Sequence, residues 1–199
     1  PNIDKKIKSI IQDVKRNKDI ALIKYEKKYS NIKNILIKDI KFSITERKNI
    51  IKKLDKKTKN SIDLAFNRIF NFHKRQKILP YSYRDKFQNL FSYKSRPLKR
   101  VGVYVPGGLA SYPSSVLMNC IPALVAGVKE IYMATPAMGK FYNPAVIYAA
   151  QKCKVNEIYK VGGAQAIGAL TYGTNIIKKV DKIVGPGNIF VTSAKKQVF

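Results

Sequence analysis

Three short apolar runs in the second half of the chain each end in a glycine turn, and an expected helix follows each turn. The turns lie at 106–108, 162–163 and 185–187. In an open parallel sheet, ligands bind beyond the carboxyl ends of the strands, where glycine lets the backbone approach a phosphate or a sugar. The pattern therefore suits a nucleotide. However, no turn is a G-x-G-x-x-G or P-loop motif, and glycine also serves any tight turn.

Three polar side chains stand at these turns and could contact such a ligand. Tyr104 lies near the end of the first strand, Gln165 lies in the first turn of a helix, and Asn188 directly follows the third glycine turn. A tyrosine can stack on a ring or donate a hydrogen bond, and both amides can donate and accept, which suits ribose hydroxyls. Each residue also has a structural explanation: aromatic packing on the sheet, a polar residue in a first helical turn, and a helix N-cap.

Residues that usually hold metal ions are scarce in this chain. His73 is the only histidine, and it lies on the apolar face of an expected helix, where a packing role is more common. Cys120 and Cys153 are the only cysteines, and neither belongs to a C-x-x-C pair. Both fall in apolar helical patterns, which predicts buried free thiols. The sequence by itself thus offers no convincing zinc site and no disulfide.

The elements that position the glycine turns alternate regularly between strand and helix. We expect Ser114 or Ser115 to cap the first helix of this half and Gly127 to end it, and we expect Asn143 and Pro144 to start the second. Four strand–helix units indicate a mainly parallel sheet with right-handed crossovers. The predicted strands are 101–105, 130–134, 157–161 and 181–184, and the predicted helices are 115–126, 143–153, 164–171 and one that begins near 188.

The first half of the chain is mainly helical. Apolar residues at helical spacing predict two helices at 2–16 and 18–29, and the segment 35–42 could be a short strand. Ser43 and Glu46 fit a capping box at the start of a further helix. Beyond the helices, 80–99 reads as a loop and a β-ribbon, with a boundary near residue 100. The two later helices are predicted at 44–54 and 57–76.

Composition and charge suggest a folded protein with an unusual surface. The chain has 199 residues, 45% of them hydrophobic, and a formal net charge of +27. This charge raises the alternative of a basic nucleic-acid-binding module. The lysines are spread through many segments and occur with abundant isoleucine and asparagine, so drift of the genome toward AT-rich codons explains them better. No apolar run approaches the roughly 20 residues of a membrane span, and no signal peptide is evident, so we expect a cytoplasmic protein.

Six motifs follow one another in the second half of the chain: RVGVYVPGG at 100–108, YPSSVLMN at 112–119, IPA at 121–123, VGGAQAI at 161–167, YGT at 172–174 and VDKIVGPGN at 180–188. In this order they resemble the motifs of the histidinol dehydrogenase family. The resemblance covers 96–199 closely and 1–79 more loosely, and it implies an α/β fold in which a helical N-terminal part leads into an incomplete Rossmann-like domain. The expected division is 1–99, the helical part with the ribbon, and 100–199, the NAD-binding domain.

The resemblance also implies an activity. Members are homodimeric, zinc-containing enzymes that use two NAD in turn to oxidise L-histidinol through L-histidinal to L-histidine. The family's NAD contacts fall on Tyr104, Gln165 and Asn188. Its zinc ligands, substrate-binding residues and Glu–His acid/base pair fall beyond the position of Phe199, so we expect a fragment that contains no catalytic or metal residue. A decayed, non-catalytic relative remains an alternative.

Overall fold

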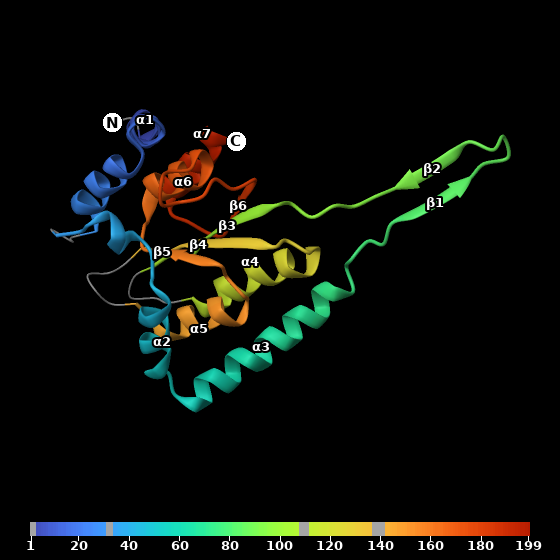
Figure 1. Cartoon of the computed structure of the whole chain (residues 1–199), viewed down its shortest axis with the longest axis horizontal. Helices are drawn as coiled ribbons and strands as arrows, with labels where there is room; N and C mark the ends of the chain where they lie inside the picture. Colours follow the sequence, from blue (N-terminus) through green and yellow to red (C-terminus); the bar gives the residue numbers. More distant parts are fainter. Residues whose placement is uncertain (1–2, 31–33, 108–111, 137–141) are drawn as a thin grey trace.

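The computed structural model describes residues 3–30, 34–107, 112–136 and 142–199, and a four-stranded sheet forms its centre (Figure 1). Neighbouring strands are all parallel, and their order is β5-β4-β3-β6. The α/β fold with a mainly parallel sheet is therefore confirmed. The strands are β3 (Arg100–Tyr104), β4 (Glu130–Ala134), β5 (Glu157–Tyr159) and β6 (Lys182–Val184).

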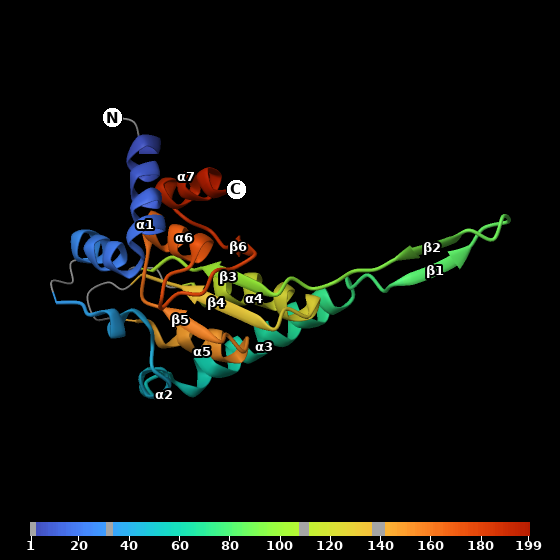
Figure 2. The same cartoon turned by 45° about the horizontal axis from the view of Figure 1, so that its top comes forward.

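Helices cover both faces of this sheet. On one face α1, α6 and α7 pack together, and on the other α2, α3, α4 and α5 do so (Figure 1 and Figure 2). Each face buries its own apolar cluster, so helices from the first hundred residues help to cover both cores. The division near residue 100 remains a prediction. The helices are α1 (Ile3–Tyr29), α2 (Ile44–Lys52), α3 (Lys56–Lys74), α4 (Pro113–Ala126), α5 (Pro144–Lys152), α6 (Gly163–Tyr172) and α7 (Ile189–Val198).

The long helix α1 bends at Lys18, whose φ of 50° and ψ of −124° leave the helical region. The bend separates the two helices that the sequence predicts. Asp13 in the first half accepts hydrogen bonds from Lys24 Nζ and Tyr25 Oη in the second half, each at 2.8 Å. Lys18 Nζ donates to the carbonyl oxygen of Gly173 at 3.1 Å. These bonds hold the two halves at a fixed angle and tie the bend to the end of α6.

Most of the expected helix boundaries are confirmed. Ser43 and Glu46 form the predicted capping box, and Gly127 ends α4 in the left-handed conformation with φ 89°. The predicted caps at Ser114 or Ser115 are wrong, because α4 already begins at Pro113 and its N-cap makes no side-chain hydrogen bond. Proline suits a first helical position, since its missing N–H would have no partner there. Within the described ranges, no helix is long and apolar enough to cross a membrane.

The segment 35–42 does not form the short strand that the sequence suggested. It contains a 3-10 helix, η1 (Ile37–Ile40), and contributes only the single antiparallel bridge between Lys41 and Tyr159. The N–H of Leu36 donates to the Asp39 carboxylate at 2.9 Å, which favours a tight helical turn over an extended strand.

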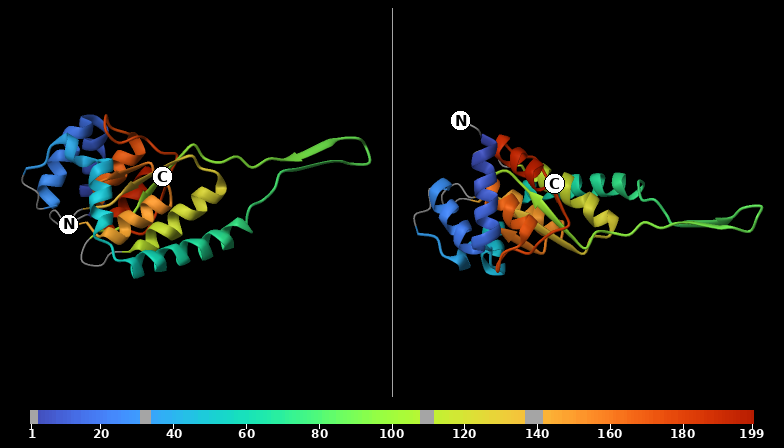
Figure 3. Two further views of the ribbon diagram at one scale, coloured as in Figure 1. Left: turned by 60° about the horizontal axis from the view of Figure 1, so that its bottom comes forward. Right: turned by 90° about the horizontal axis from the view of Figure 1, so that it is seen from above.

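The predicted ribbon is present and projects well away from the rest of the chain (Figure 3). It consists of β1 (Tyr81–Arg84) and β2 (Leu90–Tyr93), which pair antiparallel. Two cross-strand aromatic pairs stack on it, with ring centroids 5.6 Å apart for Tyr81 and Tyr93 and 5.3 Å apart for Tyr83 and Phe91. Every strand residue is exposed, so the ribbon is stabilised by its own pairs rather than by a core.

The bend in α1 generates a pH-dependent prediction. Hydrogen bonds from Lys24, Asn17 and Tyr25 lower the pKa of Asp13 to about 2. Because the folded state holds this pKa below that of the unfolded chain, the contribution to stability is complete above about pH 4 and is lost as the pH falls toward 2. Asp13→Asn should lower the free energy of unfolding at pH 7 by less than about 1 kcal/mol, since Lys24 is largely exposed.

Urea unfolding at pH 7 and pH 3 checks this expectation. The Asp13→Asn difference should be smaller at pH 3, and Lys27→Ala, which changes an exposed residue of the same helix, should matter by less than about 0.5 kcal/mol at both values. An Asp13→Asn penalty of equal size at the two pH values would contradict the role given to the carboxylate.

Candidate functional site

A cavity of about 310 Å³ lies at the carboxyl edge of the sheet, where the sequence predicts a ligand site. Tyr104, Gln165 and Asn188 all line it, so the structure brings the three predicted residues together. They come from the end of β3 and the starts of α6 and α7. The other lining residues are Lys6, Ile7, Ile10, Tyr29, Ser30, Pro136, Gly162, Gly163, Ala164 and Phe190.

The backbones at this edge approach each other too closely for side chains. A Cβ on Gly185 would stand 2.0 Å from the carbonyl oxygen of Tyr104, and Gly185 also has a φ of +108°. A Cβ on Gly162 would stand 2.4 Å from Cβ of Pro136. Glycine is therefore required at these two turns by contacts within the protein, whether or not a ligand binds.

The hydroxyl of Tyr104 joins two of the predicted elements. Tyr104 is 4% exposed, and its hydroxyl oxygen accepts a hydrogen bond from the N–H of Gly163 at 3.1 Å. Burial raises the pKa of Tyr104 above its usual value, which keeps the phenol protonated. Its O–H proton is thus available as a donor at the cavity.

Asn188 is a helix cap as well as a cavity residue. Its Oδ1 accepts from the N–H of Val191 at 3.1 Å, which confirms the structural role that the sequence predicts. In the described part of the chain, its amide NH₂ group donates no hydrogen bond. The cap therefore uses the oxygen and leaves the NH₂ group for a ligand.

Gln165 is held by a carboxylate that the sequence did not identify. Glu26 is fully buried, and its Oε1 accepts from Gln165 Nε2 at 2.9 Å and from the N–H of Gly162 at 3.2 Å. Its Oε2 accepts from the hydroxyl of Ser30. Burial raises the pKa of Glu26. A weak signal was present in the sequence, because Glu26 stands four residues after the buried Leu22 and so lies on the inner face of its helix.

Two further residues of α1 were missed at this site. Lys6 and Tyr29 line the cavity from opposite ends of the bent helix, with Lys6 Nζ 5.5 Å from the centre of the Tyr29 ring. They supply a cation and an aromatic face, groups that suit a phosphate and a flat ring respectively. Helical periodicity shows which face of α1 is apolar, but it gives no hint that the bend at Lys18 brings both ends to one cavity.

The described residues do not form a zinc site. His73 Nδ1 lies 2.7 Å from Gln76 Oε1 on α3, and both cysteines are buried free thiols, as predicted. Among the residues that the structure describes, no group of three or more His, Cys, Asp or Glu side chains could hold a metal ion.

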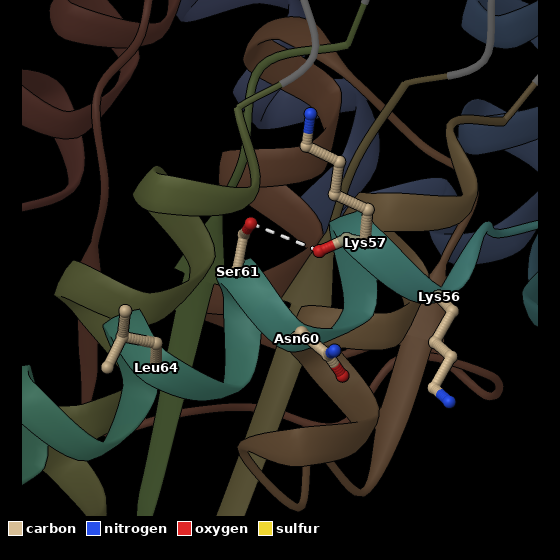
Figure 4. A pocket seen from close by; sticks show the side chains of 5 residues that line it. All are labelled: Lys56, Lys57, Asn60, Ser61 and Leu64. Carbon is tan, nitrogen blue, oxygen red and sulfur yellow. Dashed lines mark hydrogen bonds between the residues drawn. The ribbon is translucent and has the colours of Figure 1, made fainter.

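A second pocket lies along α3 and has little capacity for binding. It is lined by Lys56, Lys57, Asn60, Ser61 and Leu64 (Figure 4). The two lysine side chains point in different directions, and the Ser61 hydroxyl is turned back to the carbonyl oxygen of Lys57 at 3.1 Å. The polar groups do not converge on a common point, so the cavity at the sheet edge is the better candidate site.

Comparisons with known proteins identify relatives across the whole chain. The family model described as histidinol dehydrogenase matches residues 1–199. The histidinol dehydrogenase of Pelagibacter ubique is 54% identical over 190 residues, which are 96% of this chain and 43% of that protein. That of Caldanaerobacter subterraneus is 45% identical over 198 residues, 99% of this chain and 45% of that protein. The chain thus spans about half the length of the curated relatives it matches.

A solved structure agrees with these relatives. The crystal structure of histidinol dehydrogenase from Elizabethkingia anophelis superposes with a TM-score of 0.94 at 37% sequence identity. The match covers 100% of this chain and 45% of that chain. The similarity therefore extends to the arrangement of all the described elements in space.

The close approach at Gly185 generates a prediction with an internal control. Gly185→Ala should lower the free energy of unfolding by about 2–5 kcal/mol, because the new Cβ meets a backbone carbonyl and the φ is positive. Gly168→Ala in α6 should instead be neutral or stabilising by up to about 1 kcal/mol, since its Cβ would lie 3.5 Å from Val14 in ordinary contact. Urea unfolding measures both, and equal effects of the two substitutions would disprove the constraint at Gly185.

Proposed function

The chain belongs to the histidinol dehydrogenase family, and on that premise we propose that the protein oxidises L-histidinol through L-histidinal to L-histidine with two molecules of NAD. The family consists of oxidoreductases of histidine biosynthesis, and the proposal follows from membership in it. Because the chain spans under half the length of its relatives, the complete reaction is a proposal for the protein as its gene encodes it.

The residues of this chain are proposed to hold NAD. One observation supports this role above all: Tyr104, Gln165 and Asn188 come from three separate elements and line one cavity at the carboxyl edge of a parallel sheet. The site offers an O–H donor, an amide oxygen, an amide NH₂ group and the Lys6 cation, which together match a ligand with ribose hydroxyls and phosphates. When bound, NAD supplies the hydride acceptor, and these side chains bind and orient it.

The remaining parts of the function are proposed for residues outside this chain. The resemblance assigns the zinc ligands, the histidinol pocket and the Glu–His acid/base pair to positions beyond residue 199, and the described residues offer no alternative metal site. Assembly as a homodimer, a cytoplasmic location and the division at residue 100 are likewise proposals. The alternative of a nucleic-acid-binding module is not favoured, because the family match accounts for the whole chain.

Asn188→Asp tests the NAD site without removing the helix cap. Aspartate caps a helix as well as asparagine does, but its carboxylate cannot donate a hydrogen bond and it repels phosphate. The Kd for NAD should rise about ten-fold or more, while the free energy of unfolding changes by less than about 0.5 kcal/mol.

Asn156→Asp is the matched control for this substitution. Asn156 Oδ1 accepts from the N–H of Ile131 at 2.7 Å, at the start of β5 and thus at the opposite edge of the sheet. The Asn156→Asp substitution should change the Kd for NAD by less than about two-fold, which isothermal titration calorimetry can measure. An Asn188→Asp protein that binds NAD as tightly as the wild type would exclude the proposed contact.

The 199-residue chain by itself is expected to produce no NADH from histidinol. The resemblance places the acid/base pair and the zinc ligands beyond it, so the chemical step would lack its proton acceptor. The protein as its gene encodes it should produce NADH in the same absorbance assay, and its failure to do so would favour the decayed relative. Zinc-dependent NADH formation by residues 1–199 alone would show that the essential groups lie within them.

A further inference from the structure

The buried carboxylate of Glu26 determines which way the amide of Gln165 points. Glu26 Oε1 is an acceptor at 2.9 Å from the end of the Gln165 side chain, so the group facing it must be the NH₂ group. If the amide were turned over, two oxygen atoms would face each other at hydrogen-bond distance without a proton between them. The same Oε1 also accepts from the N–H of Gly162, which confines it to the acceptor role.

This arrangement does not depend on whether Glu26 is ionised. Burial raises its pKa, and the hydroxyl of Ser30 stands beside Oε2. A proton on Glu26 would therefore reside on Oε2, where Ser30 can accept it, because the fixed backbone N–H of Gly162 already points at Oε1. In both states the Gln165 NH₂ group is directed to Glu26.

The oxygen of the same amide is left on the cavity side. Gln165 Oε1 lies 2.9 Å from the point where a Cβ on Gly163 would stand, so it occupies space that only a glycine leaves free. Among the residues that the structure describes, no group donates a hydrogen bond to this oxygen. Gly163 itself lines the cavity, and its N–H is already bound to the hydroxyl of Tyr104.

We propose that Glu26 is a positioning residue that presents Gln165 Oε1 to the cavity as a fixed acceptor, so that the site selects a ligand with an N–H or O–H group at that point. The inference rests on the proposed NAD site and deepens it. A phosphate oxygen, which only accepts at neutral pH, cannot form a hydrogen bond with Gln165 Oε1. The candidates are the donors of the nucleotide: a ribose hydroxyl, the adenine amino group and the nicotinamide carboxamide.

A double-mutant cycle on the protein as its gene encodes it separates positioning from a general structural role. Glu26→Met, which keeps the side-chain length but cannot accept, should raise the Kd for NAD about ten-fold, and Glu26→Gln should recover most of the loss. In a Gln165→Met background, Glu26→Met should have no further effect, because its influence passes through the amide. A Glu26→Met loss that persists unchanged in that background overturns the inference, and Lys27→Ala, next to Glu26 but exposed, controls for general disturbance.

Dinucleotide analogues test the same idea without a change at Glu26, in case Glu26→Met fails to fold. The probes are deoxyribose analogues, nicotinamide hypoxanthine dinucleotide and acetylpyridine adenine dinucleotide, each of which lacks one donor. One of them should bind the wild type about ten-fold more weakly than NAD and should lose this difference in Gln165→Met. If no analogue is weaker, or if the difference remains in Gln165→Met, the acceptor role is wrong. A wild type that binds no NAD at all would instead overturn the proposed function.

Discussion

A carboxylate without solvent contact joins the first helix of the chain to the edge of the sheet. Burying Glu26 is costly unless its oxygens are bonded, and it receives hydrogen bonds from Gln165, from the Gly162 backbone and from Ser30. The donors of Gln165 and Gly162 would in turn lose this partner if α1 moved away. The cavity therefore exists only when α1 is docked, because residues of α1 form part of its lining. The glycine motifs that predict the cavity, in contrast, all lie after residue 100.

The positions of the few acidic residues help to explain the basic surface. The chain has 39 Lys and Arg residues but only 12 Asp and Glu residues, and nearly every acidic side chain accepts a defined hydrogen bond. Asp13 holds the bend of α1, Glu46 and Asp55 cap helices, and Asp63 binds Tyr148 and Lys152 across two helices. Acidic residues stand where the fold needs them, whereas lysine fills the tolerant surface, which agrees with compositional drift rather than with a nucleic-acid site.

Local chemistry explains which features could be predicted from sequence. Strands that end in glycine, the capping box at Ser43 and the left-handed end at Gly127 depend on neighbours within a few residues, so their patterns are visible. The cap at Ser114 or Ser115 was wrong because Pro113 competes for the same helix start. Glu26 was missed because periodicity identifies a buried face but gives no information on a partner 139 residues away.

The structure places the three predicted residues at one cavity, yet the sequence could not say which atom of each faces it. The Asn188 oxygen caps α7 and the Tyr104 oxygen accepts from Gly163. The Asn188 NH₂ group and the Tyr104 O–H group therefore remain as donors at the cavity. Gln165 differs, because Glu26 holds its NH₂ group and leaves its oxygen on the cavity side as an acceptor. Donors and an acceptor fixed on strand ends and helix starts are already in place before any ligand binds, and on the proposed NAD function they would orient the dinucleotide.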